Sequence, residues 1–249
     1  MLYVAMTLWL MMIVLSAWGV HRLWSGMVRP RIINMLLLPG TLVAQLGHVL
    51  GLLLTGATVN DTTLFKDDEG GEPGATRNAQ PRIPVVGHLV IGSLPLLACV
   101  LTVILITHYL GQGVLGAMAD RQVATLLPDS AAAMWTLLRD QIGLAESLVN
   151  ATTAALPGTW ELWLFLYLMI CLTVRMAPLP GNLRGSLGAI VLLGLLSGLV
   201  GLMTEAVPRY ILAGWQTLTL TVATLTVLLM ATALIRGSVG LVRSLASNS

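Results

Sequence analysis

Six stretches of this sequence are apolar over about the length that a helix needs to cross a lipid bilayer. They run over about 3–20, 35–58, 84–110, 160–177, 186–205 and 210–235. A membrane-spanning helix takes about 20 predominantly apolar residues. With 56% hydrophobic and only 10% charged residues, the chain has the composition of a membrane protein. The sequence therefore predicts an all-α membrane protein in which residues 1–249 form a single membrane domain, a polytopic bundle of about six transmembrane helices.

The last of these runs contains the segment TLTLTVATLTV, whose alternation of polar and apolar residues is typical of a strand. The apolar run as a whole is much longer than the roughly 10 residues that cross a membrane as a barrel strand. We therefore expect a helix in which the threonine hydroxyls bond back to carbonyl groups of their own helix.

Two longer connections separate the runs and differ in character. Residues 59–82 are rich in Gly, Pro and Asp and lack an apolar period, so they predict a polar loop. Residues 111–159 form an extramembrane segment in which apolar residues recur at three- and four-residue steps: Trp135, Leu138, Ile142, Ala145 and Val149. This spacing predicts an amphipathic interfacial helix over about 130–151, lying on the membrane surface or over the bundle.

The basic residues give two opposing indications about orientation. If all six runs cross and the N-terminus is cytoplasmic, seven of the 13 basic residues lie on the cytoplasmic side: Lys66, Arg77, Arg82, Arg175, Arg184, Arg236 and Arg243. This count favours two cytoplasmic termini in an integral membrane protein, which we expect in a prokaryotic inner (cytoplasmic) membrane. The cluster Arg22, Arg29 and Arg31, interpreted as the interfacial flank of two helices, favours the opposite orientation.

Composition also restricts the partners of the chain. The formal net charge is only +2 and no basic stripe with interleaved aromatic residues is present, which argues against nucleic acid. Membrane lipids and other integral membrane subunits are the partners that we expect. Cys99 and Cys171 lie within apolar runs, where a free cysteine behaves as a small hydrophobe, so we expect no disulfide.

One apolar run contains a polar motif that resembles a known family. The segment AQLGHVLGLLLTG, from Ala44 to Gly56, is similar in register to the HELGHxLxxLLxG helix of the site-2-type intramembrane zinc metalloproteases. The segment VVGHLVIGSLPLL, which contains His88, resembles the next membrane helix of that family. The segment PLPGNLRG, which contains Asn182, resembles the loop that supplies its third zinc ligand. The resemblance covers about residues 35–200.

Most of the residues that the family uses for catalysis are replaced. The resemblance places the first zinc-binding histidine at Ala44, the catalytic glutamate at Gln45 and the second histidine at His48. The third ligand falls on Asn182. A catalytic zinc site needs three protein ligands and an open position for water, and an amide cannot accept the proton that the glutamate takes. The degenerate motif therefore predicts an inactive pseudoprotease without a cofactor; if any metal binds, His48 is the expected ligand.

The same polar residues also fit a structural role. Gln45 and His48 lie about one helical turn apart and, with His88 and Asn182, form a possible polar cluster inside the bundle. A hydrogen bond between helices, with Asn182 as a candidate partner, is the alternative to ligand binding. His88, close to the polar end of its run, also fits an interfacial histidine.

Two pairs of glycines at a spacing of four predict closely packed helices: Gly47 with Gly51, and Gly194 with Gly198. Packing within the chain is one interpretation of these faces, and contact with a partner subunit is the other.

The expected function is that of a scaffold, accessory or assembly subunit of a membrane protein complex, because recognition in a former substrate groove does not require zinc. One alternative is a divergent intramembrane zinc peptidase with an unusual metal site at His48, His88 and Asn182. Another is a transporter or channel component, against which the lack of paired acids and of an inverted repeat argues.

Overall fold

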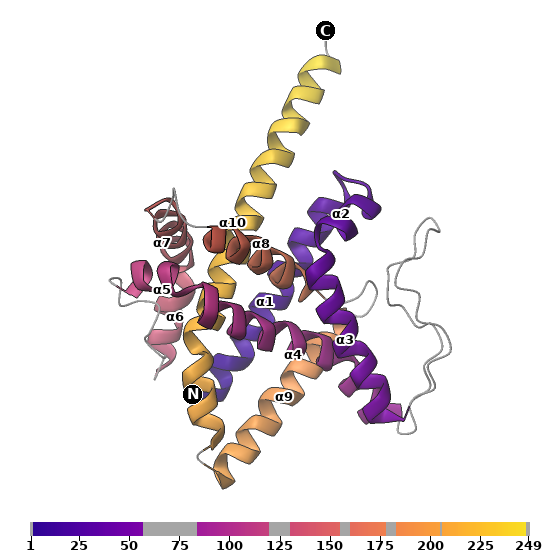
Figure 1. Cartoon of the computed structure of the whole chain (residues 1–249), viewed down its shortest axis with the longest axis vertical. Helices are drawn as coiled ribbons and strands as arrows, with labels where there is room; N and C mark the ends of the chain where they lie inside the picture. The colour runs from indigo at the N-terminus through magenta and orange to yellow at the C-terminus, as the bar shows by residue number, and fades with distance from the viewer. Residues whose placement is uncertain are drawn as a thin grey trace.

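The computed structural model of the chain describes residues 2–56, 84–119, 130–154, 160–177, 183–204 and 206–247. Every regular element in these ranges is a helix (Figure 1). The helices are α1 (Leu2–Ser25), α2 (Pro30–Leu36), α3 (Leu38–Thr55), α4 (Pro84–Leu110), α5 (Gln112–Ala119), α6 (Ala131–Arg139), α7 (Gln141–Ala154), α8 (Trp160–Arg175), α9 (Leu183–Met203) and α10 (Ala206–Ser247). The predicted all-α polytopic membrane protein is confirmed, while the predicted polar loop over 59–82 lies outside the described residues.

Five stretches of helix in the described ranges are long and apolar enough to cross a membrane: Leu2–Ser25, Leu38–Thr55, Val90–Leu110, Ser186–Met203 and Val207–Val242. The sixth predicted span, about 160–177, corresponds to α8, which has only 16 residues. At 1.5 Å per residue such a helix is about 24 Å long, shorter than a hydrocarbon core of about 30 Å. The described part of the chain therefore contains five helical stretches long enough to span a membrane and one short apolar helix, where the sequence predicted six spans.

α1 and α10 lie side by side and run in the same direction (Figure 1). Near the start of both helices, the rings of Trp9 and Trp215 stack with their centroids 5.4 Å apart. Further along both, the Trp24 indole N–H donates to the Thr232 hydroxyl over 2.9 Å. Because the residue numbers rise together, the two helices are parallel, and the start of α1 and the end of α10 lie at opposite ends of the pair.

The helix predicted for TLTLTVATLTV, with threonines bonded to their own backbone, is confirmed. The hydroxyls of Thr219, Thr221 and Thr224 donate to the carbonyl oxygens four residues earlier, over 3.0, 2.8 and 2.9 Å. All three side chains are buried. This bonding satisfies hydroxyl groups that the surrounding apolar residues keep from water.

α10 continues well past residue 235, where the last span is predicted to end. It has 42 residues, which corresponds to about 63 Å, or about twice the thickness of a hydrocarbon core. The described side chains between residues 233 and 245 are exposed. Figure 1 shows this end of α10, in yellow, projecting beyond the other helices. The sequence contains no proline after Pro208 that would end the helix earlier.

The single amphipathic helix predicted over about 130–151 is two helices, α6 and α7, separated at Asp140. The side-chain amide of Gln141 donates to the Leu137 carbonyl over 2.9 Å. In an unbroken helix this carbonyl accepts from the Gln141 backbone N–H. At the start of α6, the Ser130 hydroxyl oxygen accepts from the Ala133 N–H over 3.2 Å, as is typical of an N-cap serine.

Most of the apolar face predicted for this segment lies outside the packed interior of the described residues, which is compatible with the predicted position on a membrane surface. Trp135, Ile142 and Val149 are 68%, 64% and 43% exposed. The buried residues are Leu137, Gln141, Leu144, Ala145, Ser147, Leu148 and Ala151. The segment carries two apolar stripes, and α7 turns the second one toward α10 and α5. The neighbouring helices determine which stripe is buried, and the spacing of apolar residues within the segment does not show which helices these are.

Candidate functional site

The last turns of α8 hold the corner between α2 and α3, where the motif helix begins. The Leu36 carbonyl at this corner accepts from the Tyr167 hydroxyl over 3.0 Å and from the Cys171 thiol over 3.4 Å. One turn further along α8, the Arg175 guanidinium donates to the Asn34 side-chain oxygen on α2. These contacts fix the start of α3, and no pattern in the sequence predicts them.

The motif helix α3 packs against α4 through its glycine face. A Cβ atom added at Gly47 would lie 2.7 Å from the Leu94 carbonyl oxygen and 2.8 Å from Pro95 Cα. A Cβ atom added at Gly51 would lie 3.1 Å from Ile91 Cα. The two backbones are therefore in direct contact along an antiparallel pair of helices. This first glycine pair serves packing within the chain.

His48, which the resemblance aligns with the second zinc-binding histidine, hydrogen-bonds to the backbone of Ile91 on α4. Four residues after Ile91, α4 contains Pro95 inside the helix. Proline has no backbone N–H, so the carbonyl four residues before it loses its helical donor. We infer that the His48 ring N–H replaces the donor that Pro95 removes, and thereby joins the two helices.

Ala44 and Gln45, which the resemblance aligns with the first ligand and the base, contribute to the interior. Ala44 is partly buried against the main hydrophobic cluster of the chain. The Gln45 side-chain oxygen is buried and has no hydrogen-bond partner among the described residues. The expected bond between helices from Gln45 is therefore not made to any described residue.

The predicted cluster of Gln45, His48, His88 and Asn182 stays a prediction. Asn182 and the side chain of His88 lie outside the described residues. Gly51 faces Ile91 and the two helices are antiparallel, so His48 lies at the level of Leu94 on α4. Position 88 is six residues, or about 9 Å, further along that helix. Among the side chains that the structure describes, no group of three His, Cys, Asp or Glu residues lies close enough to hold a metal ion.

The second glycine pair packs against α1 of the same chain. A Cβ atom added at Gly194 would overlap the Thr7 side chain, and one added at Gly198 would lie 3.8 Å from the Tyr3 ring. Gly201, one turn further, also faces Tyr3, which a Cβ atom there would overlap. Both glycine faces are therefore occupied by helices of this chain.

No family model, curated protein or solved structure matches this chain significantly. The likeness to site-2-type metalloproteases therefore rests on the motif of α3 and on the order of the later segments.

Proposed function

We propose that this chain is a catalytically inactive, metalloprotease-like membrane protein that acts as a scaffold, accessory or assembly subunit of a membrane protein complex. One observation carries the proposal. The motif residues that the chain retains, Gly47, His48 and Gly51, all contact the backbone of α4. The motif is thus kept where it joins two helices and altered where catalysis would need a ligand and a base.

A subunit that holds another membrane protein needs an outward face, and α3 has one. Leu46, Leu50 and Leu53 recur at helical spacing and are 65%, 52% and 66% exposed. Since α4 covers the glycine face of α3, this leucine stripe is the surface of the motif helix that a partner helix would contact.

The proposal also covers the side of the membrane on which each terminus lies. If α1 and α10 both cross the membrane, their parallel course favours termini on opposite sides, in place of two cytoplasmic termini. Five crossings, the number of long apolar helical stretches in the described residues, also give opposite sides. A prokaryotic inner membrane stays a prediction.

An intramembrane zinc peptidase is the second candidate, and one observation favours it. Histidines that bind a metal commonly donate their second ring N–H to a backbone carbonyl. The bond between His48 and Ile91 has this form. The peptidase would require further ligands, for which His88 and Asn182 are the candidates.

We expect the tagged chain, purified in mild detergent, to contain no stoichiometric zinc and to carry a membrane protein partner in fixed ratio. His48→Ala should retain that partner, because packing and not metal binding holds α3 in place. Metal analysis by mass spectrometry and protein mass spectrometry of the same sample measure both quantities. His108→Ala is the matched control, since His108 is exposed on α4, about 25 Å along the helix from Ile91.

Two outcomes would contradict the scaffold proposal. One zinc per chain that disappears in His48→Ala and persists in His108→Ala would favour the peptidase. A chain that purifies alone under conditions that preserve membrane complexes would remove the reason for proposing a subunit.

A further inference from the structure

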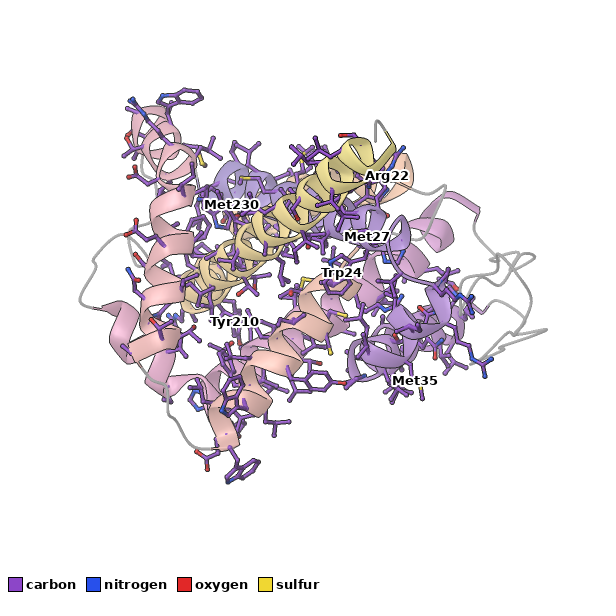
Figure 2. All side chains as sticks on the ribbon, turned by 90° about the horizontal axis from the view of Figure 1, so that it is seen from above. Arg22, Trp24, Met27, Met35, Tyr210 and Met230 are labelled. Atoms are coloured by element: carbon purple, nitrogen blue, oxygen red, sulfur yellow. The ribbon has the colours of Figure 1, made fainter. Side chains whose placement is uncertain are left out.

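The parallel course of α1 and α10 brings arginines that are distant in sequence to one end of the molecule. Arg22 lies near the end of α1, Arg29 and Arg31 lie at the start of α2, and all three are exposed. Arg236 of α10 reaches the same place, because its Nη1 atom lies 3.3 Å from where a Cβ of Gly26 would be. Figure 2, seen from above relative to Figure 1, shows Arg22, Trp24 and Met27 beside α10.

The helical segments that form this end of the molecule contain no acidic residues of their own. Residues 2–36 and 206–247 contain no Asp or Glu. A concentration of positive charge of this kind attracts anions from solution or from a membrane surface.

Apolar and aromatic groups surround these arginines, which distinguishes a lipid from a free anion. The Arg22 guanidinium lies over the Trp18 ring, 5.2 Å from its centre. Tryptophan and arginine together are typical of the boundary between the acyl chains and the headgroups. On α2, Ile32 and Met35 are 48% and 72% exposed beside the arginines. A free phosphate ion would make no favourable contact with these exposed apolar side chains.

The projecting end of α10 repeats this pattern along its length. At 100° per residue, Arg236, Gly240 and Arg243 fall on one side of the helix. Leu234, Leu241 and Leu245 fall on another side and are 75%, 62% and 65% exposed. Helices with basic and apolar faces of this kind lie in the interfacial plane of membranes with anionic lipids. A Cβ atom added at Gly237 or Gly240 would meet no other atom within 4 Å, so no other helix covers this side of the segment.

We propose that the end of α1, α2 and residues 233–247 of α10 form a surface that binds the anionic headgroups of phospholipids. The arginines contact the phosphate groups, while the exposed apolar side chains of α2 and α10 enter the acyl boundary. The surface lies on the side of the membrane to which α10 extends. It is independent of the motif on α3 and of the proposed subunit function.

The test compares spin-labelled phosphatidylglycerol with spin-labelled phosphatidylcholine in phosphatidylcholine vesicles that contain the full chain. Electron paramagnetic resonance measures the fraction of each label immobilised by the protein. We expect several-fold preference for phosphatidylglycerol at low salt, largely lost near 1 M salt, where charges are screened beyond about 3 Å. Arg29→Gln with Arg31→Gln should remove most of this preference, since each basic residue near a surface adds substantially to the attraction.

The matched control removes two exposed arginines elsewhere, through Arg139→Gln with Arg209→Gln, and should leave the preference unchanged. Arg22→Gln with Arg236→Gln provides a second test pair if the first does not fold. Equal immobilisation of the two lipids, or equal reduction by test and control pairs, would overturn the proposal. An unchanged lipid preference accompanied by a change in oligomeric state of the test pair would show a protein interface instead, and would overturn it too.

Discussion

Gly47→Ala is expected to lower the free energy of unfolding by about 1–3 kcal/mol, the range measured for overpacked interiors. The added methyl group would lie 2.7 Å from the Leu94 carbonyl oxygen and 2.8 Å from Pro95 Cα. Because these atoms belong to the backbone of α4, a side-chain rotation does not relieve the overlap, and the two helices must separate. Unfolding of the purified chain in mixed micelles, followed by circular dichroism as the fraction of denaturing detergent rises, measures the loss.

Gly92→Ala is the matched control for this prediction. Gly92 also lies within α4, but a Cβ atom there meets no other atom within 4 Å. Alanine has the higher helix propensity, by about 1 kcal/mol, so the control should be neutral or stabilising. If both variants changed the stability equally, the close contact of α3 with α4 at Gly47 would be wrong.

Trp9→Ala should have the largest effect on stability, a loss of about 3–5 kcal/mol. Trp9 is 0% exposed and Trp215 is 2% exposed, and their rings stack between α1 and α10 near the start of both helices. Removing one ring leaves a cavity and takes away the dispersion contacts that hold helices together in a membrane. The same unfolding measurement applies.

Trp135→Ala serves as the control, because Trp135 is 68% exposed on α6 and exposed substitutions usually change stability by less than about 0.5 kcal/mol. Similar losses in the two variants would mean that the tryptophan stack does not join α1 to α10. The parallel course of these helices, on which the arrangement of the termini depends, would then lose its main support.

The helices were predictable because a bilayer imposes their length and composition. Long apolar runs have few alternatives in a membrane, since every backbone N–H and carbonyl must be satisfied within the segment. The same requirement explains why the threonines of α10 bond to their own helix rather than form a strand. Helix ends were less predictable, because Arg236 ends the apolar run of α10 while no proline ends the helix itself.

Contacts between helices were only partly predictable. The spacing of Gly47 and Gly51 predicted a close approach but not that α4 would occupy it. The two apolar stripes of residues 130–151 were equally compatible with burial, and the neighbouring helices α5 and α10 decide which one packs inside the chain. The direction of α10 relative to α1 depends on how many apolar runs cross the membrane. Apolar length alone does not decide whether a helix as short as α8 crosses.

At the candidate site, the sequence singled out Gln45 and His48 as polar residues of an apolar helix but did not predict the contact of His48 with Ile91. The signal was present in Pro95, since a proline inside an apolar helix leaves the carbonyl of Ile91 in need of a donor. Pairing that carbonyl with His48 requires knowing that α3 and α4 are antiparallel neighbours in register. The buried side-chain oxygen of Gln45 has no comparable hydrogen-bond partner among the described residues.

A double-mutant cycle between His48 and Pro95 tests most directly whether His48 is a structural donor. In the wild-type background, His48→Ala should lower the free energy of unfolding by about 0.6 to 2 kcal/mol, as expected for a hydrogen bond between membrane helices. In the Pro95→Ala background the new backbone N–H serves the Ile91 carbonyl, so His48→Ala should lower it by much less. Equal losses in both backgrounds would contradict the structural role of His48 and return it to the set of candidate metal ligands.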